Sequence, residues 1–241
     1  MAETAPDGSP VDLYATLPRL GEPELLHDSV PAGTEILELG CGTGRITHGL
    51  VALGHPVVAV DQSPKMLSHV LGAETVLADI EGLQLGRAFR VVLLASQLVN
   101  TAEDDRRRRF LTTCRRHVSD DGVVIVQRLD PEAGWDETET SVGGVRVRML
   151  DLRRDGSLVS ATAEYRTADQ VWRHPFTSRI LEDLALDQAL AEAGLARRRW
   201  LDAPHVWVEA APATVSEGSR QMKRQRGLGA VQRFPGSMEG G

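Results

Sequence analysis

The stretch ILELGCGTGRIT, residues 36–47, constrains the fold more than any other part of the chain. An apolar run ends there in three glycines, Gly40, Gly42 and Gly44, which are separated by one residue each. The next residues, RITHGLVALG (45–54), place apolar side chains at helical spacing and end in a glycine. In an open parallel sheet, ligands bind beyond the carboxyl ends of the strands, where glycine lets the backbone approach them closely. The stretch therefore predicts a strand, a tight turn and a helix around a nucleotide-like cofactor.

Strand and helix patterns alternate over the first half of the chain. Further strands are predicted at PVVAVD (56–61), TVLAD (75–79), FRVVLLAS (89–96) and, after a turn, in DDGVVIVQRLD (120–130). SPKMLSHVLG (63–72) begins with a serine N-cap and a proline, as helices do, and a longer helix is predicted within 101–122. This alternation predicts an α/β fold with a mostly parallel sheet that helices cover on both faces.

The pattern changes in the second half. Residues 145–176 alternate polar and apolar side chains around a turn at Asp155-Gly156, which predicts antiparallel strands. Residues 177–195 predict one amphipathic helix, and residues 197–212 predict one or two last strands. We therefore expect an N-terminal helical lid (1–31) that starts with a disordered stretch and is broken at Pro18 and Pro23. A main domain (32–212) with an inserted antiparallel segment (143–176) and a disordered basic tail (213–241) would follow.

Composition excludes several classes. The formal net charge of -7 gives no general attraction to nucleic acid or to an anionic membrane, and no apolar run is long enough to span a bilayer. The N-terminus lacks the pattern of a secretory signal, and the two cysteines form no metal-ligand spacing. The four arginines at 106–109 are interpreted as a solvated helix face. We expect a cytoplasmic protein without a metal, either a monomer or a homodimer.

The residues around the glycines narrow the choice of cofactor. A dinucleotide-binding site requires the motif G-x-G-x-x-G, but Arg45 stands at the position of its third glycine. Glu38, two residues before the first glycine, suits a cationic amine better than a pyrophosphate. Asp61 ends the second predicted strand, where a carboxylate can accept hydrogen bonds from both ribose hydroxyls. Asp79 ends the third and can accept a hydrogen bond from an adenine amino group, with Ile80 and Met66 against the ring. S-adenosylmethionine (SAM) has all of these parts and no phosphate.

The sequence resembles the class I SAM-dependent methyltransferases. The resemblance rests on ELGCGTG (38–44), VVAVDQSPKML (57–67), LADIE (77–81), VVLLASQLVN (91–100) and DDGVVIVQ (120–127), in that order. It implies a Rossmann-like sheet of seven strands that ends in an antiparallel hairpin, with SAM as the cofactor. The expected cofactor-binding residues are Tyr14, Glu38, Gly40, Cys41, Gly42, Gly44, Asp61, Gln62, Met66, Ala78, Asp79, Ile80, Ala95 and Ser96.

The methyl acceptor is expected to be a small molecule. The segment ASQLVN (95–100) lacks the clamp of nucleobase methylation, the acids that hold magnesium and the paired glutamates of protein-arginine enzymes. An aromatic or heterocyclic secondary metabolite is the favoured acceptor, and methylation at carbon, nitrogen or oxygen stays open. Expected substrate-binding residues are Gln97, Asn100, Tyr165, Trp172 and Arg179.

His174 is the candidate base, because imidazole changes its protonation near neutral pH. Arg128 would hold a substrate carboxylate or pair with surface acids. If the acceptor is a neutral amine or an electron-rich carbon, positioning alone suffices for an in-line displacement. Two alternatives remain, a nicotinamide-dependent oxidoreductase and a SAM-binding protein without catalytic activity.

Overall fold

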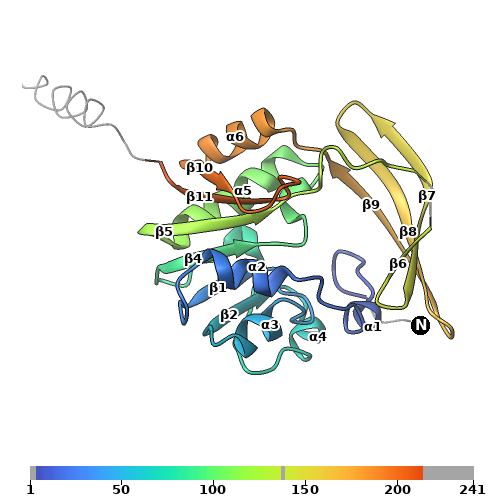
Figure 1. Ribbon diagram of the computed structural model, residues 1–241, viewed down its shortest axis with the longest axis horizontal. Coiled ribbons are helices and arrows are strands. Elements are labelled where there is room, and N and C mark those ends of the chain that lie inside the picture. The colour runs from blue at the N-terminus through green and yellow to red at the C-terminus, as the bar shows by residue number, and fades with distance from the viewer. Residues whose placement is uncertain (1–3, 137–138, 214–241) are drawn as a thin grey trace, which may run out of the picture.

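The computed structural model describes residues 4–136 and 139–213 and contains two sheets (Figure 1). The larger sheet has seven strands in the order β10-β11-β5-β4-β1-β2-β3. Its strands are β1 (Ile36–Leu39), β2 (Val57–Asp61), β3 (Glu74–Leu77), β4 (Phe89–Leu94), β5 (Val118–Gln127), β10 (Leu195–Trp200) and β11 (Trp207–Pro212). Strands β1 to β5 pair in parallel, whereas β11 pairs antiparallel with both β5 and β10. The predicted α/β fold with a seven-stranded, mostly parallel sheet is confirmed.

Helices cover both faces of the larger sheet, as its continuous apolar strands require. One face packs against α5 (Asp104–His117) and α6 (Asp183–Glu192), with Phe110, Leu111 and Leu186 in a shared core. The other face packs against α2 (Glu22–Ser29) and α3 (Thr47–Ala52), through Leu26 and Leu50. The shorter elements are α1 (Val11–Tyr14), α4 (Pro64–Leu67), η1 (Ile80–Gly82) and η2 (Leu98–Asn100).

A second, antiparallel sheet stands beside the carboxyl ends of the parallel strands, with α1 next to it (Figure 1). Its strands are β6 (Thr140–Val142), β7 (Val145–Asp155), β8 (Leu158–Arg166) and β9 (Val171–Arg179), in that order across the sheet. The predicted turn at Asp155-Gly156 connects β7 and β8. Side chains alternate between two faces of this sheet, so one face looks toward the larger sheet and the other toward solvent.

Several element boundaries differ from the expectations. Residues 177–179 belong to β9, so α6 starts only at Asp183, and the expected turn at 120–122 lies inside β5. Pro23 lies in the first turn of α2, where its missing N–H costs nothing, and does not separate two helices. Of the four consecutive arginines, Arg107 is buried and bonds Asp104 and the carbonyl of Thr101, so this stretch is not wholly solvated.

Two expectations concern the ends of the chain. Residues 4–10 contain a closed turn in which Ala5 and Ser9 pair through their backbones, so the first ten residues are not all disordered. The predicted tail lies, from residue 214 on, outside the described residues. In the part of the chain that the structure describes, no helix is long and apolar enough to cross a bilayer.

Arg128 joins three elements at the end of β5. Its guanidinium is fully buried and donates to the carbonyls of His205 and Leu181 at 2.8 and 2.6 Å, and to the carboxylate of Asp183 at 2.5 Å. The group also lies 4.5 Å from the ring centre of Trp200. Arg128 is therefore occupied by the fold itself and does not face a substrate.

We predict that Arg128→Ala lowers the free energy of unfolding by about 3 kcal/mol, because it leaves two carbonyls and a carboxylate without their buried donor. Denaturant unfolding followed by both fluorescence and circular dichroism measures the change. The matched control is Arg90→Ala, at a side chain that is 67% exposed, which should change stability by less than about 0.5 kcal/mol. Equal losses in the two variants would contradict a structural role that is particular to Arg128.

Candidate active site

A cavity of about 460 Å³ lies at the carboxyl ends of the parallel strands. Three parts of the chain form its walls: the loops after β1 to β4, the N-terminal segment up to Leu20, and the inner face of the second sheet. This is the position at which open α/β sheets bind their ligands. The volume lies in the range of sites that bury a small molecule or cofactor.

The glycine turn after β1 lines the cavity with backbone. Gly40 and Gly42 have φ angles of +74° and +56°, which L side chains adopt only with strain. A Cβ atom built on Gly40 would lie 2.5 Å from Cδ1 of Leu98, so a larger residue there would also require the Leu98 side chain to move. A Cβ atom on Gly42 meets nothing within 4 Å, and that glycine lines the open cavity. The two glycines therefore serve different purposes, close packing against η2 and free approach of a ligand.

Glu38 brings a buried carboxyl group to the floor of the cavity. Only 2% of the residue is exposed, and its Oε2 accepts a hydrogen bond of 2.5 Å from Oγ1 of Thr47. Burial raises the pKa of this carboxyl to about 7, although the Thr47 hydrogen bond and Arg45 act in the opposite direction. The group is therefore poised to ionise when a cation arrives beside it.

Asp61 and Asp79 follow neighbouring strands and lie in the same cavity. One carboxylate oxygen of Asp61 accepts from the backbone N–H of Gly42 at 2.9 Å, and the other accepts from that of Ser63 at 2.8 Å. These bonds fix the carboxylate in the plane of the turn and leave lone pairs on both oxygens for a ligand. Burial raises the pKa of Asp61 from its ordinary value. Asp79 caps η1 by accepting from the N–H of Glu81 at 2.9 Å.

The N-terminal segment is fastened to the glycine turn at two points. The hydroxyl of Thr43 donates to the backbone carbonyl of Tyr14 at 3.0 Å, and Arg45 forms an ion pair with Glu22, a residue that is only 6% exposed. The segment thus covers the cavity because residues of the turn itself hold it there. Arg45 occupies the position of the third glycine in a dinucleotide motif, and its side chain is the one that anchors the cover.

The second sheet contributes the polar wall opposite the glycine turn. His174 on β9 and Tyr165 on β8 line the cavity, together with Tyr14 of the N-terminal segment. The Nδ1 atom of His174 is buried and has no hydrogen-bond partner among the described residues. Burial raises the pKa of Tyr165 to about 12 and also raises that of Tyr14, so both phenols stay protonated. The wall therefore presents neutral hydroxyl groups and one imidazole nitrogen that is free to bind a ligand.

Most of the predicted site residues come together in this cavity. Its lining includes Tyr14, Glu38, Gly40, Cys41, Gly42, Asp61, Gln62, Met66, Ala78, Asp79, Ile80, Ser96, Gln97, Tyr165 and His174. Ser96 and Gln97 follow β4 with left-handed φ angles of 54° each, a strained turn that directs them to the cavity. The thiol of Cys41 is buried, which raises its pKa and keeps it protonated.

Five predicted residues lie outside the lining of the cavity. Asn100 is fully buried and links the carbonyl of Arg179 to the N–H of Leu129. Arg179 donates to Ser157 and to the carbonyl of Ala102 in a neighbouring groove. Trp172 packs with Leu13 and Val145, where it joins the second sheet to the N-terminal segment. Gly44, beside His48, and Ala95, in the core, complete this group.

Other lining residues were not predicted. They are Ala5, Asp7, Ser9, Leu17, Pro18, Leu20, Thr43, Arg45, Ile46, Leu98, Thr101, Arg106, Phe110, Val147 and Ser178. Phe110 lies in the helix predicted within 101–122, and Asp7 lies in the N-terminal stretch that was expected to be disordered. Arg45 could have been noticed in the sequence, because it stands where a dinucleotide motif has its third glycine. This difference served only as an argument against a dinucleotide ligand. The remaining residues reach the cavity through tertiary packing.

The sequence and the fold of this chain are similar to those of known proteins. Residues 36–122 match the family model described as a methyltransferase domain. The chain is 27% identical over 146 residues to a cypemycin N-terminal methyltransferase from Streptomyces sp., and this match spans 58% of each chain. The fold is also similar to that of a SAM-dependent methyltransferase from Clostridium acetobutylicum, with a TM-score of 0.67 and 17% identity over 84% of this chain and 95% of that one. The fold is similar, too, to that of the sugar N-methyltransferase KedS8 from Streptoalloteichus sp., with a TM-score of 0.64. The two chains are 18% identical, and the match covers 89% of this chain and 94% of that one.

The matched segment and the fold are thus similar to those of SAM-dependent methyltransferases. The matched segment is residues 36–122, and the chain spans little more than half of the length of the curated relative.

The raised pKa of Glu38 predicts a pH dependence of stability. The folded protein keeps a proton on Glu38 up to about pH 7, whereas the ordinary value is 4.5. The contribution of this group to stability is therefore fully present below about pH 4.5 and is lost as the pH rises through 7. Glu38→Gln removes the titration, so the stability of the variant relative to the unaltered protein should increase from pH 5 to pH 8.

Urea unfolding of both proteins at pH 5, 6, 7 and 8 measures this difference. Glu24→Gln, at an exposed carboxyl group of α2, is the matched control and should show no such trend. A stability difference between the Glu38 variant and the unaltered protein that stays constant across this range would contradict the raised pKa.

Proposed function

We propose that the chain transfers a methyl group from SAM to an amine nitrogen of a small molecule. The observation that carries this proposal is the convergence of three strand-end carboxyl groups, Glu38, Asp61 and Asp79, on the cavity that also holds His174. The acids match the amine, ribose and adenine of the cofactor, and the histidine lies on the wall that remains for an acceptor.

The residues of the turn suit the amino-acid end of SAM. Glu38 would hold the ammonium group, and the ionised form of its carboxyl would become favoured beside that positive charge. Arg45 lines the same part of the cavity and would hold the carboxylate, with Glu22 keeping its guanidinium in place. Asp61 would bind both ribose hydroxyls, and Asp79 the adenine amino group. SAM supplies a methyl group that is already activated on a sulfonium sulfur.

The second sheet suits an amine acceptor. A neutral amine has a lone pair for in-line attack, and its nitrogen must lose one proton in the overall reaction. Nδ1 of His174 has no partner among the described residues and would accept that proton. Tyr14 and Tyr165, whose phenols stay neutral, would orient the amine and exclude water from the cavity. Alignment of the amine nitrogen with the methyl group would then supply most of the rate acceleration, and His174 would act as an additional base.

The comparisons support nitrogen as the acceptor atom. The curated relative is described as an N-terminal methyltransferase and one structural neighbour as a sugar N-methyltransferase. Of the aromatic side chains, Trp172 and Phe176 do not line the cavity, whereas Tyr14, Phe110 and Tyr165 do. The lining therefore suits an amine with or without an aromatic ring.

The cofactor assignment predicts tight binding of S-adenosylhomocysteine, which isothermal titration calorimetry measures directly. Asp61→Ala should weaken this binding by about 100-fold, since two hydrogen bonds to a charged group contribute about 3 kcal/mol. Asp121→Ala, at a carboxyl group on the surface of β5, is the control and should leave the affinity unchanged. Binding of NAD in preference to S-adenosylhomocysteine would overturn the assignment and favour an oxidoreductase.

The role of His174 predicts a loss of turnover without a loss of cofactor binding. His174→Ala should lower kcat by about 100-fold on whichever amine of a primary and secondary amine panel is methylated. His69→Ala, at an exposed histidine, should keep full activity. Mass spectrometry of the product identifies the methylated atom. Methylation of oxygen or carbon only would refute the amine proposal, and a panel without any turnover would favour a non-catalytic SAM-binding protein.

A further inference from the structure

The cavity is lined by one carboxyl group to which the cofactor contacts proposed above give no role. Glu38, Asp61 and Asp79 are matched to the amine, ribose and adenine of SAM, and the remaining acid of the lining is Asp7. Asp7 belongs to the N-terminal segment, and its side chain is exposed at the cavity. It forms no ion pair within residues 4–136 and 139–213. A carboxylate is therefore available there for a positively charged part of a ligand.

A closed turn holds Asp7 in place. The backbone N–H of Ala5 donates to the carbonyl of Ser9 at 2.9 Å, and that of Gly8 donates to the carbonyl of Ala5 at 2.9 Å. Oδ1 of Asp7 accepts from the N–H of Ser9 at 3.0 Å, which leaves its second oxygen for a ligand. The turn is also anchored by packing, because the buried Ala5 contacts a small apolar cluster that includes Met66 of the cavity. The carboxylate thus has a defined position.

This turn lies between the cofactor half of the cavity and the wall formed by the second sheet. The N-terminal segment, dark blue in Figure 1, stands beside that sheet, and a Cβ atom built on Gly8 would lie 3.9 Å from Cε1 of His174. On the other side, Asp7 acts electrostatically on Asp61 and Tyr14. Burial raises the pKa of both groups, and the negative charge of Asp7 raises each further. Asp7 is therefore close to the ribose site and to the wall at once.

The positive sulfur of SAM would occupy the same region. The sulfonium is bonded to the ribose carbon chain, and its methyl group must face the wall that receives the acceptor. S-adenosylhomocysteine has the same amine, ribose and adenine but lacks the methyl group and the positive charge. Glu38, Asp61 and Asp79 would contact parts that the two molecules share, so these acids do not distinguish them. A carboxylate between the ribose site and the wall attracts only the charged form.

We propose that Asp7 is a specificity-determining residue that faces the sulfonium and selects SAM over S-adenosylhomocysteine. This inference rests on the proposed function, because it uses the placement of the ribose on Asp61. Preference for the charged form limits rebinding of the spent cofactor. The device belongs to the N-terminal segment, so the cover of the cavity also recognises the state of the cofactor.

Isothermal titration calorimetry of the full chain with SAM and with S-adenosylhomocysteine tests the proposal. Asp7→Asn keeps the oxygen that accepts from Ser9 and removes only the charge. It should weaken binding of SAM by about fivefold, since the carboxylate is exposed and partly screened, and that of S-adenosylhomocysteine by less than about twofold. The matched control is Asp12→Asn, at an exposed carboxylate of α1 that does not line the cavity. It should leave both affinities unchanged.

The salt dependence gives a second measurement. The loss of SAM affinity in Asp7→Asn should shrink in 0.5 M sodium chloride, because salt screens an exposed charge. Equal weakening of both ligands would assign Asp7 a structural role in the turn and overturn the proposal, and so would an unchanged affinity for SAM. If the unaltered protein binds neither ligand, the proposed function fails and this inference fails with it. If it binds both and only the Asp7 result is negative, the proposed function stands without this inference.

Discussion

The hydrogen bond between the carboxylate of Asp61 and the backbone of Gly42 is the constraint on which the site depends. It ties the turn after β1 to the end of β2, so two neighbouring strands present their loops as one rigid surface. The turn can close only because Gly40 packs under Leu98 and takes a φ angle that other residues resist. From the same turn, Thr43 and Arg45 hold the N-terminal segment over the cavity. A change in this turn would therefore disturb the floor and the cover of the site together.

The cavity combines a floor that carries carboxyl groups with a wall that carries phenols and an imidazole. Its floor is buried and acidic, so Glu38 stays partly protonated in the absence of a cation. Its far wall, on the second sheet, holds neutral phenols and the unpartnered nitrogen of His174. A cofactor with a positive end suits the floor, and an acceptor that must lose a proton suits the wall. The floor and the wall thus belong to two different sheets.

How far the sequence predicts a residue of the site depends on how far apart in the chain that residue and its contacts lie. Gly40, Gly42, Asp61 and Asp79 follow directly from strands whose apolar runs are recognisable, and all four line the cavity, whereas Gly44 does not. Asn100 was expected to bind a substrate, and Arg128 was expected to bind a substrate carboxylate or to pair with acids. Both instead bond backbone groups of distant segments, and Arg128 also pairs with Asp183. Asp7 and Phe110 were missed for the opposite reason. Nothing near them in the chain indicates that a turn of the N-terminal segment or one side of α5 faces a ligand.

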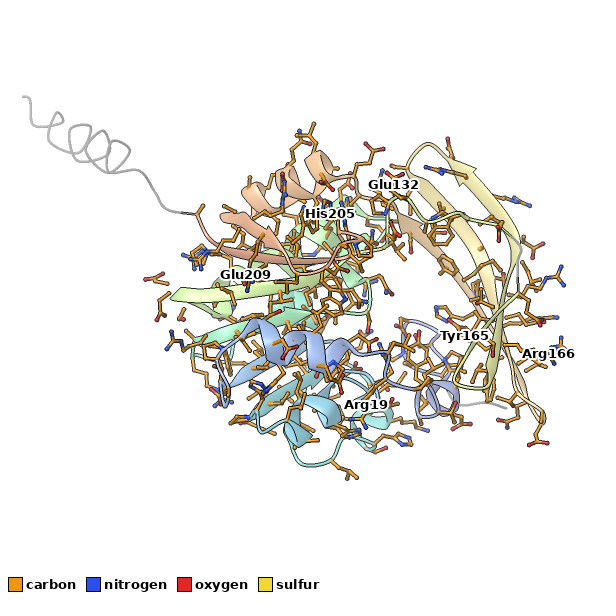
Figure 2. All side chains as sticks on the ribbon, viewed as in Figure 1. Arg19, Glu132, Tyr165, Arg166, His205 and Glu209 are labelled. Atoms are coloured by element: carbon orange, nitrogen blue, oxygen red, sulfur yellow. The ribbon has the colours of Figure 1, made fainter. Side chains whose placement is uncertain are left out.

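The sequence by itself determined the parallel sheet, the order of its first strands and the cofactor end of the cavity, because periodicity and strand ends are properties of neighbouring residues. The tertiary structure decided which face of the second sheet looks inward, and so why Tyr165 lines the cavity while Arg166 lies on the outer side of the sheet (Figure 2). It also decided that Trp172 packs against the N-terminal segment instead of facing an acceptor. These outcomes depend on contacts between segments far apart in the chain, whose relative placement is set by packing and not by local pattern.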